Sequence, residues 1–130
     1  MTFVGTNYFL RFLLNDVFIQ KEKVNQLFIK GSSGQEKLFT NTIVIFEIYW
    51  VVKNGYGPKN PLTKKFLLQV CNLDFITLGD RQILINAIKN FDKFSYDFED
   101  AYHYYFAKSH KITTIATFDK KLKNKFKTLK

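Results

Sequence analysis

Cysteine, turn-forming residues and long apolar runs are all scarce in this chain of 130 residues. The single cysteine, Cys71, excludes an internal disulfide, and no other Cys or His stands near it at metal-ligand spacing. Two prolines and six glycines favour regular secondary structure over long loops. No apolar run reaches the roughly 20 residues that a membrane helix needs, and no basic N-terminal segment precedes an apolar one. A cytoplasmic chain without a membrane span is therefore expected, with Cys71 in its core.

Acidic residues are also in the minority. Eleven Asp and Glu stand against 20 Lys and Arg, and the formal net charge is +9 at pH 7. This excess suits a polyanionic partner, either nucleic acid or an anionic membrane surface, but a lysine-rich surface that only keeps the chain in solution explains it equally well. What the chain has in quantity is apolar and aromatic residues, at 46% and 18%. They suffice for one packed core, so residues 1–130 are predicted to form a single domain.

Short apolar strands alternate with amphipathic segments along the chain. The predicted strands cover residues 3–4, 38–40 and 111–117. The predicted helices cover residues 8–14, 19–30, 43–53 and about 80–91, together with one from residue 61 or 62 to 71 and one from residue 95 or 97 to 107. Thr6 or Asn7 is expected to cap the first helix, and Asn41 or Thr42 the third. The alternation predicts an α/β sandwich around a parallel sheet.

Glu47 is the most informative acidic residue, because almost all its neighbours between Ile43 and Val52 are apolar. The helix is therefore expected to be buried on most sides, and a buried carboxylate needs a positively charged partner. A metal ion is one such partner. A salt bridge to Lys or Arg, or an exposed place on a narrow polar stripe, is the alternative.

Three further acids follow in the second half of the chain. Asp97 and Asp100 are three residues apart and can share one helix face, and Asp97 is also a good N-cap. Asp119 directly follows the predicted strand 111–117, where ligands of parallel sheets gather. For Asp119 alone, a turn or a helix cap is the simpler explanation.

The order and context of these residues resemble the PIN domain, and within it the VapC-type toxins of bacterial toxin–antitoxin systems. The matching segments are Phe3-Val4-Gly5-Thr6-Asn7, Ile43-Val44-Ile45-Phe46-Glu47-Ile48, Asp97-Phe98-Glu99-Asp100-Ala101 and Thr117-Phe118-Asp119. The resemblance implies a three-layer α/β/α sandwich with a central, mainly parallel sheet. It also implies an acidic cluster that holds Mg²⁺ or Mn²⁺ and hydrolyses RNA.

Residue by residue, the resemblance makes Glu47, Asp100 and Asp119 ligands of the ion or of its waters, with Asp97 as a fourth acid. Thr6, Asn7 and Thr117 would orient the acids through hydrogen bonds. One position departs from the family pattern, because the first segment normally carries Asp where this chain has Gly5. The implied endoribonuclease is therefore expected to be impaired or inactive. The alternative is a noncatalytic RNA-binding or antitoxin-binding module with the same fold.

The resemblance further implies three partners, namely RNA, a cognate antitoxin protein and a second copy of the chain. Lys120, Lys121 and Lys123 directly follow Asp119 and can hold the RNA backbone without reading its sequence. The lysines at the very end, Lys127 and Lys130, are interpreted as a solvated tail.

Overall fold

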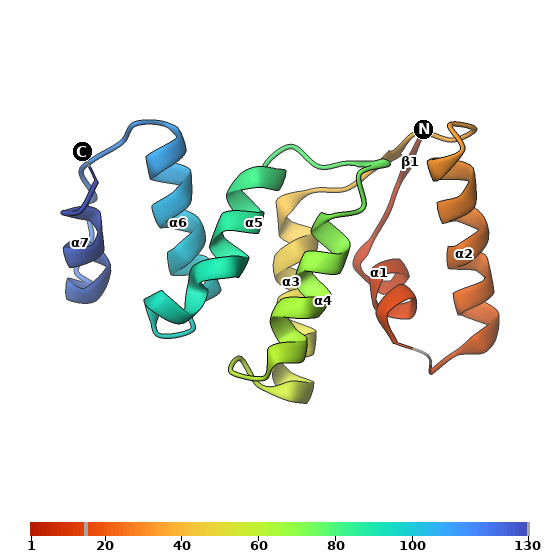
Figure 1. The fold of residues 1–130 in the computed structure, drawn as a ribbon, viewed down its shortest axis with the longest axis horizontal. Coiled ribbons are helices and arrows are strands. Elements are labelled where there is room, and N and C mark those ends of the chain that lie inside the picture. The colour runs from red at the N-terminus through yellow and green to blue at the C-terminus, as the bar shows by residue number, and fades with distance from the viewer. Residues whose placement is uncertain (15, 130) are drawn as a thin grey trace. The chain divides into compact units, whose positions relative to one another are not determined.

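The computed structural model describes residues 1–14 and 16–129, so the prediction for Lys130 lies outside the described residues. The chain divides into two compact units, Met1–Asp80 and Arg81–Lys130, which we call the N-terminal unit and the C-terminal unit. Figure 1 shows the elements in chain order. Each unit is described by itself below.

The N-terminal unit contains a parallel sheet of three very short strands. These are β1 (Thr2–Phe3), β2 (Leu38–Phe39) and β3 (Ile76–Thr77), in the order β1-β2-β3. Thr2 pairs with Leu38, and Leu38 in turn pairs with Ile76. Leu38 is the central residue and is almost fully buried, as an apolar residue covered on both faces of a parallel sheet should be. The expected α/β class with a parallel sheet is confirmed.

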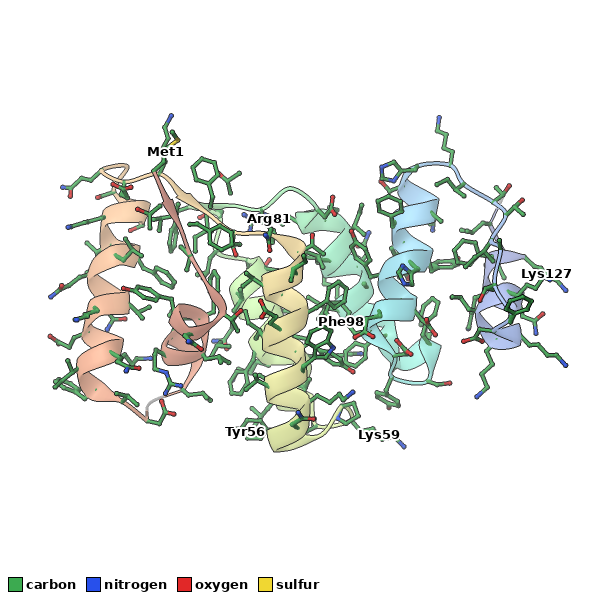
Figure 2. All side chains as sticks on the ribbon, turned by 180° about the vertical axis from the view of Figure 1, so that it is seen from behind. Met1, Tyr56, Lys59, Arg81, Phe98 and Lys127 are labelled. Atoms are coloured by element: carbon green, nitrogen blue, oxygen red, sulfur yellow. The ribbon has the colours of Figure 1, made fainter. Side chains whose placement is uncertain are left out.

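Four helices accompany this sheet. They are α1 (Thr6–Leu13), α2 (Phe18–Ser32), α3 (Thr42–Tyr56) and α4 (Pro61–Cys71). Helix α1 packs against α2 and α3, and α3 packs against α4. Tyr56 ends α3, and Lys59 stands in the turn before α4 (Figure 2). The Asn41 side chain caps α3 by accepting a hydrogen bond from the Val44 amide at 3.1 Å, as predicted.

The regular elements in the described part of the C-terminal unit are all helices. It consists of α5 (Arg81–Asn90), the short 3₁₀ helix η1 (Phe91–Phe94), α6 (Phe98–Ser109) and α7 (Lys120–Phe126). Helix α5 packs along α6 around Phe91 and Phe98, which are fully buried. Helix α7 attaches to α6 through a small apolar cluster of Ala107, Leu122 and Phe126.

The structure differs from the sequence prediction at two places. The strand predicted over 111–117 is absent, because Lys111 has a φ of 58° and residues 112–117 have no assigned secondary structure. Alternating β-branched residues favour an extended chain, but a strand also needs a hydrogen-bonded neighbour, and the described C-terminal unit contains none. The second difference is β3, which was not predicted, because two residues are too few to show an alternating pattern. Cys71 is buried and free, as expected.

No helix among the described residues is long and apolar enough to cross a membrane. That agrees with the absence of long apolar runs in the sequence.

Candidate functional site

Gly5 lies between the end of β1 and the start of α1, where it occupies the N-cap position without a side chain to cap the helix. The prediction that Thr6 or Asn7 caps α1 is therefore wrong. The backbone of Gly5 is extended, with φ of −90° and ψ of 172°, a conformation that any residue can adopt. A β-carbon built on Gly5 would meet no atom within 4 Å. Nothing in the backbone or the packing therefore requires glycine at this position.

Glu47 faces the same region from the middle of α3. Its carboxylate accepts a hydrogen bond from the Thr6 hydroxyl, with Oγ1 and Oε1 3.0 Å apart. Gly5, Thr6, Asn7 and Glu47 line one cavity of about 460 Å³. The expectation that Glu47 is buried is wrong, because its side chain is exposed. Glu47 shares the exposed face of α3 with the apolar side chains of Ile43, Trp50 and Val51, so it stands neither in the core nor on a polar stripe.

Asp97 and Asp119 both act as helix N-caps in the C-terminal unit. Asp97 Oδ1 accepts a hydrogen bond from the Asp100 amide at 3.0 Å, and Asp119 Oδ1 accepts one from the Leu122 amide at 3.1 Å. The Thr117 hydroxyl accepts a hydrogen bond from the Asp119 amide at 3.1 Å and so holds the backbone of that residue. Each aspartate satisfies an amide that the first helical turn leaves unpaired, and each keeps a second carboxylate oxygen outside this bond.

Asp100 differs from these two, because it caps no helix. Burial raises the pKa of its carboxyl, and the negative charges of Asp97, Asp119 and Glu99 raise it further, while His103 acts in the opposite direction. The ionised form of Asp100 is therefore disfavoured by its surroundings. Such a local excess of negative charge is what a bound cation would relieve.

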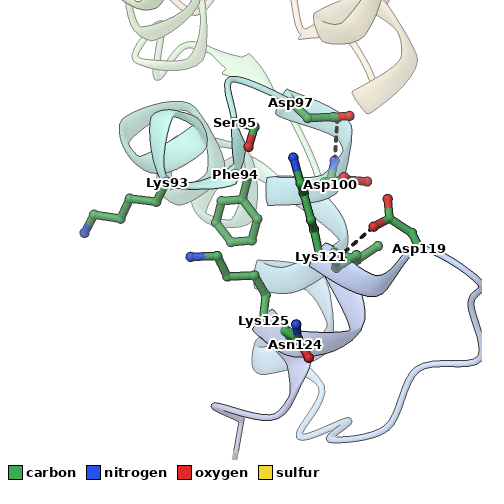
Figure 3. A pocket seen from close by; sticks show the side chains of 10 residues that line it. Lys93, Phe94, Ser95, Asp97, Asp100, Asp119, Lys121, Asn124 and Lys125 are labelled. Carbon is green, nitrogen blue, oxygen red and sulfur yellow. Dashed lines mark hydrogen bonds between the residues drawn. The ribbon is translucent and has the colours of Figure 1, made fainter.

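The three aspartates line one cavity of about 460 Å³ in the C-terminal unit (Figure 3). Among residues 1–14 and 16–129, however, no three His, Cys, Asp or Glu side chains lie close enough to form a ready set of metal ligands. The donors are all oxygen atoms, which is the ligand type that Mg²⁺ prefers. The carboxylate oxygens of the aspartates therefore suit Mg²⁺. Glu47, the remaining predicted acid, belongs to the N-terminal unit.

Sequence reasoning missed several polar residues of this cavity. Of the three lysines predicted to bind RNA, only Lys121 lines it, whereas Lys120 and Lys123 do not. Lys93 and Lys125 complete the lysine side, together with Asn124. Lys125 belongs to the same lysine-rich segment after Asp119; it stands four residues after Lys121 and shares its helix face.

Sequence reasoning also missed Asp80, an acidic residue of the N-terminal unit. Asp80 follows β3 and accepts a hydrogen bond from the Thr42 hydroxyl at 3.3 Å. Its position after a strand went unnoticed because β3 itself was missed. Thr42 begins α3, the helix that carries Glu47, so this contact fixes the start of that helix.

Comparison with protein families decides the classification. The model of the PIN domain matches residues 2–127, which is nearly the whole chain. The chain belongs to the PIN-domain family. PIN domains are generally metal-dependent nucleases that act on RNA. Membership of the family therefore supports a nuclease-type function, to which the acidic residues described above are relevant. No curated protein and no solved structure matches this PIN domain significantly.

Proposed function

We propose that this PIN domain is a Mg²⁺-dependent endoribonuclease toxin of the VapC type, from a type II toxin–antitoxin system, and that Gly5 impairs it. Glu47, Asp100 and Asp119 would hold Mg²⁺ or Mn²⁺ with help from Asp97. The cognate antitoxin and a second copy of the chain are the proposed protein partners, and the cytoplasm is the proposed location.

One observation supports this proposal above the others. The position at which the PIN pattern expects an aspartate is open, extended and next to the Thr6–Glu47 hydrogen bond. An aspartate would fit at Gly5 without moving the backbone, and it would add a carboxylate to the cavity that Glu47 lines. The missing group is therefore a single side chain, and the backbone that would position it is already in a suitable conformation.

The residues have separate tasks in the proposed reaction. When bound, Mg²⁺ supplies a polarised water and neutralises charge on the phosphate. The Thr6 hydroxyl holds Glu47 in one orientation by donating a hydrogen bond to its carboxylate, and Asp97 and Asp119 are held in place by the helices that they cap. Asp100 contributes a carboxylate that already carries an electrostatic penalty, so a cation beside it is favoured.

The decisive experiment compares Gly5→Asp with Gly5→Asn. Both side chains can cap α1, but only aspartate adds a negative charge. We expect Gly5→Asp to raise Mg²⁺-dependent cleavage of a random-sequence oligoribonucleotide pool by roughly 100-fold or more, because a metal ligand should matter at least as much as the groups that orient it. Calorimetric titration with Mn²⁺ should show tighter binding for Gly5→Asp than for Gly5→Asn.

Two controls complete this test. Adding Glu47→Gln to Gly5→Asp should abolish the restored cleavage, and EDTA should do the same. If Gly5→Asp and Gly5→Asn behave alike in both cleavage and Mn²⁺ binding, position 5 is not a lost ligand position and the nuclease proposal is wrong.

The second candidate is a noncatalytic module that binds RNA or an antitoxin. It is favoured by Gly5 itself and by the lack of a ready three-ligand group among the described residues. Unchanged RNA affinity with and without Mg²⁺, together with no cleavage by Gly5→Asp, would select this candidate.

A further inference from the structure

The cavity of the C-terminal unit has two chemically different sides. Asp97, Asp100 and Asp119 form the acidic side, and we call Lys93, Lys121 and Lys125 the cavity lysines. Its volume of about 460 Å³ is within the usual range for sites that hold a small molecule or one residue of a polymer.

The apolar attachment of α7 determines which lysines face the cavity. Leu122 and Phe126 are buried against Ala107 of α6, which fixes the rotation of α7 about its axis. Lys121 and Lys125 are four residues apart and therefore project from the same face (Figure 3). Lys120, Lys123 and Lys127 lie elsewhere on the segment, are exposed and do not line the cavity; we call them the outer lysines. Figure 2 shows Lys127 on the outer side of α7.

Lys93 reaches the cavity from η1, on the opposite side from α7. The turn that follows is strained, because Ser95 and Tyr96 have φ values of 56° and 61°, in the left-handed region that non-glycine residues avoid. Phe94, between Lys93 and this turn, is buried and lies beneath Lys125, whose Nζ is 5.4 Å from the ring centroid. A cation held over an aromatic face is partly positioned before any ligand arrives.

The cavity lysines do not neutralise the aspartates that share their cavity. Among the described residues of this cavity, no ion pair joins one of these lysines to Asp97, Asp100 or Asp119. Opposite charges therefore line one cavity without closing onto each other. A ligand suited to this arrangement carries negative charge at intervals along a chain, as a polynucleotide backbone does.

We propose that the cavity lysines form a binding subsite for the RNA phosphate that neighbours the one at the acidic side. This subsite deepens the proposed ribonuclease function and rests on it for the identity of the polymer. Lys93 and Lys125 join Lys121 as RNA-binding residues, whereas Lys120 and Lys123 contribute only to the general positive field. Asn124 adds an uncharged hydrogen-bonding group to the same wall.

The test compares two triple variants of the full chain. Lys93→Ala/Lys121→Ala/Lys125→Ala removes the cavity lysines, and Lys120→Ala/Lys123→Ala/Lys127→Ala removes the outer lysines. Both remove three positive charges from the formal net charge of +9, so the overall field changes equally. Binding of a fluorescent 20-nucleotide single-stranded RNA is measured in EDTA over a series of NaCl concentrations. Thermal melting checks that both variants fold, and all six lysines are exposed.

Each phosphate contact with a single strand contributes about 0.7 to the slope of log affinity against log salt. We expect loss of the cavity lysines to lower that slope by about 2 and to weaken binding roughly tenfold or more at low salt. Loss of the outer lysines should change the slope by less than one contact, about 0.7.

Equal losses in the two variants would overturn the proposal, because the effect would then come from net charge alone. Unchanged RNA binding by the variant without the cavity lysines would also overturn it. If that variant keeps its RNA affinity but loses affinity for an acidic peptide, the proposal is equally overturned. The measurement requires neither metal nor cleavage. A failure of Gly5→Asp to restore nuclease activity therefore leaves this result interpretable on its own.

Discussion

The two units begin their helices in different ways. In the C-terminal unit, aspartate side chains cap both α6 and α7, at 3.0 and 3.1 Å from the amides that they accept. In the N-terminal unit, asparagine side chains, Asn41 and Asn60, cap α3 and α4, and α1 begins at Gly5 without a side-chain cap. An aspartate at the start of a helix can serve the helix and a ligand together, so its presence alone does not reveal which role matters.

This difference changes the weight that each acid carries. Asp97 and Asp119 have a structural reason to be present even in a chain that binds no metal. Asp100 caps no helix, and although it stands in the first turn of α6, where a negative charge is favoured, burial and the neighbouring acids disfavour its ionised form. Glu47 is held by Thr6 and stabilises no helix end. Asp100 and Glu47 are therefore the acids that point most directly to a function.

The largest expected effect concerns whether the two units fold together. Phe98 is fully buried in the C-terminal unit, and Phe98→Ala should lower the free energy of unfolding by about 3–5 kcal/mol. The single tryptophan, Trp50, reports only on the N-terminal unit, whereas far-ultraviolet circular dichroism reports on all helices. We expect the urea transitions from both probes to shift together, as a single PIN domain over residues 1–130 should.

An unshifted Trp50 transition would contradict that expectation and would make the units independent domains. Phe118→Ala is the control, because the Phe118 side chain is fully exposed at 105%. It should change the free energy of unfolding by less than about 0.5 kcal/mol.

A smaller effect separates the two roles of Asp119. Asp119→Ala removes the cap of α7 and should lower the free energy of unfolding by about 1 kcal/mol, whereas Asp119→Asn keeps a capping oxygen and should cost little. Urea denaturation measures both. Equal destabilisation by the two substitutions would mean that the charge of Asp119, and not its cap, supports the fold.

The smallest effect is a gain in stability. The pKa of Asp100 is raised above its ordinary value. The Asp100 carboxyl group therefore binds its proton more tightly in the folded state than in the unfolded chain. The group thus favours folding fully only at acidic pH, and this contribution is lost as pH rises through the raised pKa. In metal-free buffer at pH 7, Asp100→Asn should raise the melting temperature by roughly 1 °C, and the gain should vanish near pH 3.

Asp74→Asn is the matched control for this change. Asp74 is an exposed aspartate of the N-terminal unit, so its substitution should leave the melting temperature nearly unchanged. A lower melting temperature for Asp100→Asn at pH 7 would show that Asp100 stabilises the fold and that repulsion is not its main interaction.

Much of the helical structure could be predicted from the residues alone. The helix predicted from residue 61 or 62 to 71 spans Pro61–Cys71, and Asn41 and Asp97 were among the predicted caps, because periodicity and cap chemistry are local properties. The strand predicted over 111–117 was wrong, and β3 was missed, because strand formation is not a local property. A strand exists only with its neighbour, and a pattern along one segment does not contain that neighbour.

For the site, the sequence by itself determined which groups are available: oxygen donors at Glu47, Asp97, Asp100 and Asp119, a glycine at position 5 and an excess of lysine. These follow from residue identity and order. Only the tertiary structure decided how they are used. Packing of α7 on α6 places Lys121 and Lys125 in the lining of the cavity and leaves Lys120 and Lys123 outside it, and the fold of the N-terminal unit leaves Glu47 exposed beside Thr6. Side-chain direction depends on which helix face is buried, and that is settled by contacts between segments distant in the chain.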